Sequence, residues 1–226
     1  MTNKITEDAV EELAINLLED EGYSYIHAQT IAPDADTPER KDFSDVILIE
    51  RLRTAIDTIN PSLPSEAKEE ALKKVLNLPS QDLIANNEAF HKMLTDGIEV
   101  EYNVDGHLKG DKTWLINYDD INKNDFLACN QFTVVEENKN RRPDIVLFIN
   151  GLPLVVIELK NPADENATVK KAYTQLQNYK TAIPSLFHYN SILVASDGLD
   201  AKVGSLTAGW SRFHAWKSID GEIVSS

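Results

Sequence analysis

Apolar residues recur at helical spacing in four segments of the first half of the chain. In residues 7–20 they are Val10, Leu13, Ala14, Leu17 and Leu18, which follow the 3.6-residue period of a helix. We expect the Val10–Leu13–Leu17 stripe to pack on a sheet. The same pattern predicts further helices over residues 45–59, 65–77 and 80–97. In the last of these, Ser80 is expected to be the N-cap and Gly97 to follow the end of the helix.

The later part of the chain switches to short runs that are typical of strands. After a short extended stretch near residues 22–33, strands are predicted at 98–102, 113–118, 131–135, 144–149, 152–159 and 191–196. A helix is predicted over about 165–180, and the aromatic tail 204–216 is predicted to form a strand pair. The helical segment 44–96 is then expected to be an insertion between the first helix and the sheet.

Charged residues stand out in the two apolar strands 144–149 and 152–159. Glu158 and Lys160 are two positions apart, so they share one face of their strand, and Asp144 begins the preceding strand. Between the strands, Asn150-Gly151 is a hairpin signal.

The length of the hairpin loop decides whether the two carboxylates meet. A two-residue loop pairs Ile149 with Leu152 and puts Asp144 and Glu158 on opposite faces. A three-residue loop ending at Gly151 pairs Phe148 with Leu152 and puts both on one face. We favour the three-residue loop, because glycine tolerates the left-handed conformation that it needs.

Two neighbouring carboxylates repel each other unless something neutralises them. A divalent cation with oxygen ligands does so, and the carbonyl of Leu159 is a further ligand candidate. With Lys160 beside them, the group has the composition of a metal-assisted hydrolysis site. The alternative is a surface ion pair of Asp144 or Glu158 with Lys160. Strands that are apolar on both faces favour the site, because unpaired buried charge is costly.

Overall charge argues against a free-standing DNA-binding protein, since the net charge is −15. Residues 1–113 carry 11 Lys and Arg against 24 Asp and Glu, whereas residues 114–226 carry 11 against 13. The second half, with a net charge of −2, is therefore the part that could approach a polyanion such as DNA if a partner supplied the positive field. Cys129 is the only cysteine, the start of the chain is too acidic for a signal peptide, and no apolar run is long enough for a membrane span. These features predict a cytoplasmic protein without a membrane segment.

Pro143-Asp144 and Glu158-Leu159-Lys160 resemble the PD-(D/E)xK nuclease signature. The surrounding segments RRPDIVLFINGLPLVVIELKNP, YTQLQNYK, FHKMLTDGIEVEY and GSLTAGWSRFHAWK are similar to the N-terminal region of the restriction (R, or HsdR) subunit of type I restriction–modification enzymes. The resemblance runs from about residue 7 to 217. It implies an α/β restriction-endonuclease-like core, with a mixed central sheet flanked by helices, in a single domain over 1–226 that contains the 44–96 insertion.

The resemblance also implies Mg²⁺-dependent hydrolysis of double-stranded DNA. It makes Asp144 and Glu158 the metal ligands and Lys160 the catalytic lysine. Gln175 and Tyr179 match the QxxxY element of RecB-like nucleases, and they are expected to brace the site or contact DNA. The alternative for this pair is a core tyrosine with a neighbouring amide.

In this superfamily a further acidic residue often comes from the first core helix. Glu7, Glu11 and Glu12 are the candidates. We favour Glu11 as a third metal ligand, because Ala14, Ile15 and Leu18 place it beside the apolar face. The alternative is a solvated glutamate that interacts favourably with the start of the helix. Arg141 and Arg142 either bind phosphate or pair with the glutamates at 136 and 137.

The motor region of such subunits needs a GxxxxGK[ST] motif to bind ATP, and this sequence contains none. We therefore expect an N-terminal fragment of a longer protein, with ATP bound by the part that is missing. The resemblance names the methylation and specificity subunits as partners. Two other interpretations stay open: a non-catalytic docking domain, and a stand-alone RecB-like repair nuclease, which does not explain the flanking matches.

Overall fold

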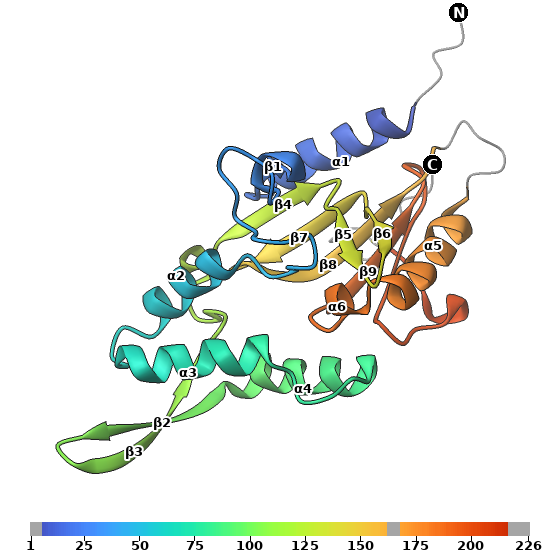
Figure 1. Ribbon diagram of the computed structural model, residues 1–226. Coiled ribbons are helices and arrows are strands. Elements are labelled where there is room, and N and C mark those ends of the chain that lie inside the picture. Colours follow the sequence, from blue (N-terminus) through green and yellow to red (C-terminus); the bar gives the residue numbers. More distant parts are fainter. Residues whose placement is uncertain (1–5, 162–167, 217–226) are drawn as a thin grey trace, which may run out of the picture.

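A seven-stranded mixed sheet forms the centre of the computed structural model, which describes residues 6–161 and 168–216 (Figure 1). The β1–β4 and β8–β9 pairs are parallel and the other pairs are antiparallel. This arrangement confirms the expected α/β class with a mixed sheet. In order across the sheet, the strands are β1 (Ser24–His27), β4 (Phe126–Asn130), β7 (Ile145–Ile149), β8 (Leu152–Leu159), β9 (Ile192–Ser196), β10 (Ala201–Gly204) and β11 (His214–Ala215).

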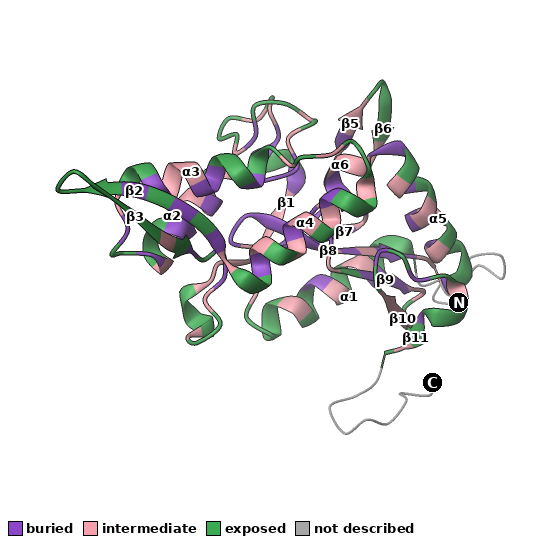
Figure 2. Ribbon diagram, turned by 90° about the horizontal axis from the view of Figure 1, so that it is seen from below, coloured by how far each residue is buried: buried purple, intermediate pink, exposed green. Residues whose placement is uncertain are grey.

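Helices cover both faces of the sheet. On one face, α1 (Glu7–Asp20) packs Val10 and Ile15 against the side chains of Ala128, Ile145 and Leu147. On the other face, α5 (Val169–Ala182) belongs to the larger core, and the short α6 (Pro184–Phe187) follows it. The central strands are buried between these layers (Figure 2). No helix in the described part of the chain is long and apolar enough to span a membrane.

The predicted insertion consists of α2 (Ile49–Ile59), α3 (Ser65–Leu76) and α4 (Leu83–Asp96). It leads into the hairpin β2 (Ile98–Val104) and β3 (His107–Thr113), which extends away from the central sheet (Figure 1). Side chains of α2 and α4 join the same core as the central strands. The description of 44–96 as an insertion within one domain stays a prediction.

Two of these helices begin later than the sequence pattern indicates. Residues 45–48 precede α2, because the Leu48 N–H is bonded to the Gly151 carbonyl (3.0 Å) and holds the chain against the β7–β8 turn. Asp82 caps α4 by accepting the Ala85 N–H (2.8 Å). Ser80 instead accepts the N–H of Asp82 (3.0 Å), so it was wrong as the N-cap. Gly97 follows the helix with a φ of +75°, as predicted.

Several strand predictions need correction. Residues 114–118 are not a strand, because the Asn60 side chain binds both the N–H and the carbonyl of Trp114 (2.8 Å each). In place of a strand at 131–135, β5 (Val134–Glu136) pairs with β6 (Lys139–Arg141) in a separate hairpin. The central strand β4 lies earlier than that run and was not predicted.

The last third of the chain follows the predicted order with shifted bounds. Helix α5 begins at Val169, and residues 165–167 of the predicted helix lie outside the described residues. In the aromatic tail, His214 and Ala215 form β11, which pairs with Lys202 and Val203 of β10 rather than with a second strand of the tail. Short 3-10 turns, η1 (Ala28–Ile31), η2 (Ile121–Lys123) and η3 (Trp210–Arg212), complete the description.

The β7–β8 hairpin has a two-residue turn, so the predicted three-residue loop was wrong. Ile149 pairs with Leu152, and Asn150 and Gly151 both have positive φ, +55° and +77°. Two successive left-handed residues are the geometry of a type I′ turn. The positive φ of Gly151 was predicted correctly.

A β-bulge in β8 brings Asp144 and Glu158 onto the same face of the sheet, although a two-residue turn alone would put them on opposite faces. Phe148 pairs with Pro153 and Leu147 pairs with Val155, so Leu154 is the extra residue of β8. Proline lacks the N–H of a regular ladder, so an irregularity beside Pro153 has a clear physical reason. Beyond the bulge, Ile145 pairs with Ile157, and continuing this register by one residue puts Asp144 opposite Glu158.

Candidate active site

Asp144 and Glu158 lie on the same face of the sheet. Val146 is two positions after Asp144, and Val156 is two positions before Glu158. Strand residues two apart share a face, and both valines belong to the larger core beneath α5. The Asp144 Oδ2 accepts the N–H of Leu159 (2.7 Å), which fixes the carboxylate against the end of β8. The hairpin therefore brings the two carboxylates together, although by a different turn from the one predicted.

Glu158 is fully buried, with 0% of its surface exposed. Its Oε1 accepts a bond from Lys160 Nζ (2.9 Å). Its Oε2 is buried and accepts no hydrogen bond of normal geometry among residues 6–161 and 168–216, although the Tyr179 hydroxyl is close enough to lower the pKa of Glu158. A buried carboxylate oxygen without a partner is costly. A cation next to this oxygen would remove that cost, so the donor set fits a divalent metal ion.

Both carboxyl groups hold their protons more tightly than usual. Burial raises the pKa of Glu158 to about 8, and the neighbouring Asp144 adds to the rise while Lys160 opposes it. Burial also raises the pKa of Asp144 to about 6, against the lowering effect of the Leu159 N–H. The two carboxylates are therefore under-neutralised by the protein alone.

Lys160 links the end of β8 to α1. Its ammonium, on a side chain that is 15% exposed, contacts Glu158, the Oε1 of Glu7 (3.1 Å) and the carbonyl of Leu159 (2.7 Å). Burial lowers the pKa of Lys160, but the carboxylates of Glu158, Asp144 and Glu7 outweigh it and raise the pKa overall. The ammonium stays charged at neutral pH as a result.

Gln175 and Tyr179 lie four residues apart on α5 and contact each other. The Gln175 Nε2 donates to the Tyr179 hydroxyl (2.6 Å), which donates to the carbonyl of Arg142 (3.4 Å). Tyr179 is buried, and after burial itself the charge of Glu158 is the largest cause of its raised pKa. The pair therefore ties α5 to the segment that enters Asp144.

Glu11 is held by two amides. Its Oε1 accepts from Asn130 Nδ2 (2.6 Å) and its Oε2 accepts from Gln131 Nε2 (2.5 Å). The Tyr25 hydroxyl donates in turn to Asn130 Oδ1 (3.1 Å). Gln131 also donates its backbone N–H to the Asp144 carbonyl (2.8 Å), so Glu11 supports the backbone on which Asp144 lies.

The stripe of α1 that packs on the sheet differs from the predicted one. Leu13 and Leu17 are 55% and 57% exposed, and the packed residues are Val10, Ala14, Ile15 and Leu18. Ala14, Ile15 and Leu18, the neighbours for which Glu11 was chosen, do pack on the sheet. Only the Leu13 and Leu17 part of the predicted stripe was wrong.

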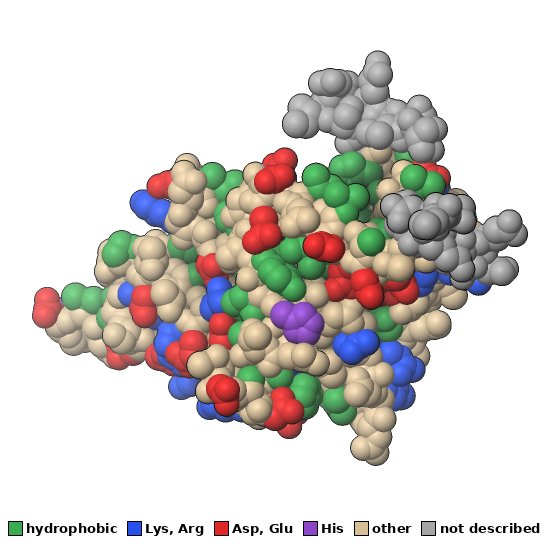
Figure 3. All heavy atoms as spheres, turned by 90° about the horizontal axis from the view of Figure 1, so that it is seen from above, with side chains coloured by type: hydrophobic (Ala, Val, Ile, Leu, Met, Phe, Trp, Pro, Cys, Tyr) green, Lys and Arg blue, Asp and Glu red, His purple; other side chains and the backbone are tan. Residues whose placement is uncertain are grey.

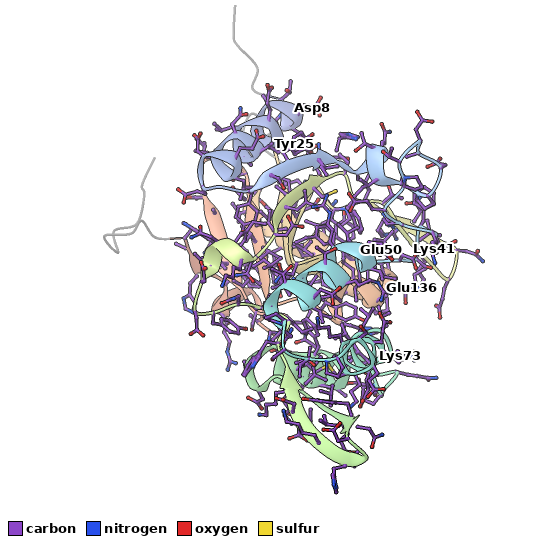
Figure 4. The ribbon with its side chains drawn as sticks, turned by 90° about the vertical axis from the view of Figure 1, so that its left-hand side faces the viewer. Asp8, Tyr25, Lys41, Glu50, Lys73 and Glu136 are labelled. Atoms are coloured by element: carbon purple, nitrogen blue, oxygen red, sulfur yellow. The ribbon has the colours of Figure 1, made fainter. Side chains whose placement is uncertain are left out.

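An open cleft of about 870 Å³ lies between α1 and the ends of the strands. It is lined by Glu7, Glu11, Asp144, Lys160 and Gln175, with Asp8 and Tyr25 on the α1 and β1 side (Figure 4). In the view from the α1 side, acidic side chains gather over this face and basic ones lie along its edge (Figure 3). Asp144 thus opens onto this cleft, whereas Glu158 is fully buried behind it.

Comparison with known proteins decides the family. The family model for the type I restriction enzyme R protein N terminus matches residues 4–212. The chain belongs to this family. It is 37% identical, over 96% of its length, to the type I restriction enzyme HindI endonuclease subunit of Haemophilus influenzae. It is 39% identical, over 97% of its length, to the putative type I restriction enzyme MjaIXP endonuclease subunit of Methanocaldococcus jannaschii.

The chain spans 21% of the length of each of these two relatives. Family membership supports the nuclease interpretation of the motif. The relatives' names describe whole subunits, so the chain corresponds to the region at the start of such a subunit. A divalent metal is in keeping with this family of restriction endonucleases.

Within residues 6–161 and 168–216 there is no preformed cluster of three or more His, Cys, Asp or Glu that could hold a metal ion. Asp144 and Glu158 are a pair, and both oxygens of Glu11 are bonded to amides. Glu11 as a metal ligand stays a prediction that requires its carboxylate to leave Asn130 and Gln131.

Four contributors to the site were not assigned from the sequence. Glu7 was weighed and passed over, yet it contacts Lys160. The other three come from a pair of neighbouring strands: Tyr25 belongs to β1, Asn130 ends β4, and Gln131 follows it directly. The usable signal was the polar Asn130-Gln131 pair after the apolar run 126–129, which was not recognised as a strand of the central sheet.

Proposed function

We propose that this chain is the endonuclease region of a type I restriction enzyme R subunit and hydrolyses phosphodiester bonds of double-stranded DNA. The observation that carries the proposal is the pairing of Asp144 with buried Glu158, whose Oε2 lacks a partner in the described chain, next to the ammonium of Lys160. These residues match the nuclease signature, and two of them, Asp144 and Lys160, line an open cleft.

We infer that Mg²⁺ is the cofactor. Carboxylate and carbonyl oxygens are the ligands that hard divalent cations prefer, and Asp144 and Glu158 would hold the ion. When bound, such an ion polarises the phosphate and lowers the pKa of attacking water. Burial disfavours the ionised form of both carboxyl groups and raises their pKa values. A bound cation would therefore stabilise the ionised pair.

The other side chains have distinct roles in the proposal. The Lys160 ammonium is near enough to Glu158 to stabilise negative charge that develops on the scissile phosphate. Gln175 and Tyr179 position the Arg142–Asp144 backbone through the hydroxyl bond to the Arg142 carbonyl. Glu11 accepts the side-chain amide of Gln131, and the backbone N–H of Gln131 donates to the Asp144 carbonyl. Glu11 thus positions the Asp144 backbone through Gln131.

The wider setting is also a proposal. A region of this kind would act with the methylation and specificity subunits of a restriction complex, in the cytoplasm, and ATP would be used by a motor region rather than by these residues. Sequence recognition would come from the specificity subunit.

The second candidate is a non-catalytic docking domain. The net charge of −15 favours it, because a strongly acidic chain is repelled by DNA. The under-neutralised carboxylates favour the nuclease, because a purely structural core gains nothing from an unpartnered Glu158 oxygen.

Single substitutions in the assembled restriction enzyme separate the two candidates. Asp144→Ala, Glu158→Ala and Lys160→Ala should each abolish DNA cleavage and leave ATP hydrolysis by the motor intact. Glu88→Ala, on an exposed face of α4 where Glu88 pairs with Lys92 (3.5 Å), is the matched control and should cut normally. Cleavage at near the unmodified rate by Asp144→Ala would refute the nuclease assignment.

A further inference from the structure

A second groove lies next to the catalytic cleft, on the α5 side. It has a volume of about 710 Å³ and runs between β6 and α5. Cations line it from both elements, Lys139 and Arg141 from β6 and Lys171 from α5. No Asp or Glu is among its lining residues within the described chain, which is unusual in a protein of net charge −15.

The regular geometry of both elements produces this lining. Lys139 and Arg141 are two apart on a strand, so their side chains leave the same face of β6. Lys171, Thr174 and Asn178 follow helical spacing, so they form one exposed stripe along α5. The two elements thus present cations and hydrogen-bond donors toward a shared channel.

These cations are available for a ligand. Lys139 has only a long, exposed contact with Glu137 (3.8 Å), which contributes little to stability. The Arg141 guanidinium bonds the carbonyl of Asn140 (2.7 Å), which leaves its charge without a counter-ion in the described chain. The nearby Glu136, labelled in Figure 4, accepts both the N–H (3.1 Å) and the hydroxyl (2.7 Å) of Ser185.

The groove and the cleft beside Asp144 share a lining residue. Gln175 lines both, and Tyr179, which lines the groove, lies close to Glu158. A polymer strand that passes from the groove over Gln175 therefore reaches Asp144 and Lys160. Phosphate oxygens match three cations and several donors much better than an apolar or acidic ligand does.

We propose that the β6–α5 groove binds the phosphodiester backbone of the DNA strand to one side of the scissile phosphate. This inference rests on the proposed function and adds the path of the bound strand. The groove is lined by cations and by no described carboxylate, so it offsets the repulsion between the acidic first half and DNA. Contacts to phosphate carry no sequence information, in keeping with recognition by another subunit.

Binding measurements on the 226-residue chain test the groove directly. The probe is a fluorescent 20-base-pair duplex in EDTA, and its affinity is measured by anisotropy over a range of salt concentrations. The test protein carries Lys139→Gln, Arg141→Gln and Lys171→Gln. The control carries Lys92→Gln, Lys109→Gln and Lys123→Gln, which remove the same charge at exposed lysines that form surface ion pairs.

The groove variant should bind on the order of 10- to 100-fold more weakly at low salt, and its salt slope should fall by about 2 to 3, since each phosphate contact contributes about 0.9. The control should stay within about twofold. Equal effects of the two triple variants, or no measurable binding by the unmodified chain, would overturn the proposal. So would equal affinity for a polyglutamate peptide, because the groove would then fit an acidic protein.

The outcome is separable from the nuclease assignment. If the groove variant binds normally while Asp144→Ala abolishes cleavage, the strand path is wrong and the proposed function stands. If the groove variant loses DNA binding while Asp144→Ala still cuts, the groove stands and the catalytic assignment is wrong.

Discussion

Replacing Asp144 by asparagine should stabilise the metal-free protein at alkaline pH. The asparagine oxygen can still accept the Leu159 N–H at 2.7 Å, so the substitution removes charge while keeping shape and hydrogen bonding. What it removes is an ionised carboxylate that burial disfavours and that lies beside Glu158. The expected gain is therefore electrostatic and depends on pH.

The sign and size of the effect follow from the pKa shift. Burial raises the pKa of Asp144 from its model-compound value of 3.8 to about 6. A raised native pKa stabilises the fold fully below about pH 4, and this contribution is lost as the pH rises through about 6. At about 1.4 kcal/mol per pKa unit, ionised Asp144 costs the folded state on the order of 3 kcal/mol at pH 8. Asp144→Asn should recover most of this at pH 8 and almost nothing at pH 4.

Urea unfolding in EDTA at pH 4, 6 and 8 measures the effect. Asp105→Asn is the matched control, because Asp105 is exposed at the β2–β3 turn with a φ of +51°, a conformation that asparagine tolerates. It should change the free energy of unfolding by less than about 0.5 kcal/mol at each pH. A gain by Asp144→Asn that is the same at pH 4 and pH 8, or a loss at pH 8, would refute the reasoning.

Three further substitutions test other parts of the site. Lys160→Met leaves buried Glu158 without its cation, so unfolding by urea should show a loss of a few kcal/mol that is larger at pH 9 than at pH 5; a pH-independent loss would contradict this. Gly151→Ala places a methyl group 2.4 Å from the Leu48 carbonyl at a φ of +77° and should lower the free energy of unfolding by on the order of 3 kcal/mol, whereas a change below 1 kcal/mol would count against the turn geometry. Glu11→Gln should slow cleavage and weaken its dependence on Mg²⁺, with a modest loss of thermal stability because its NH₂ group would face one of the amide donors of Asn130 and Gln131; unaltered cleavage at limiting Mg²⁺ would remove Glu11 from the site.

Local spacing was sufficient to predict the two strands that carry Asp144 and Glu158. Glu158 and Lys160 share a strand face whatever the fold, and a charge pair in an apolar strand is rare enough to mark a site. The helices of α2 to α4 were predicted for the same reason, because their apolar periods and stop residues are local. Asp144 was expected on the same face as Glu158, and the register of the hairpin agrees.

The remaining errors concern interactions between distant segments. The bulge at Leu154 depends on packing around Pro153, and loop length alone does not reveal it. Leu13 and Leu17 fit the helical period as well as the packed residues do, so the sequence does not distinguish the exposed side. The partners of Glu11, Asn130 and Gln131, are about 120 residues away, and only pairing of β1 with β4 brings them to α1.

Anomalous diffraction from Mn²⁺-soaked crystals of the chain tests most directly whether Asp144 and Glu158 hold a divalent cation. We expect a single strong peak or a close pair of peaks next to Glu158 Oε2 and the Asp144 carboxylate, which is absent from Glu158→Gln crystals soaked in the same way. Full Mn²⁺ occupancy elsewhere in the molecule, with no peak at these two carboxylates, would contradict this expectation.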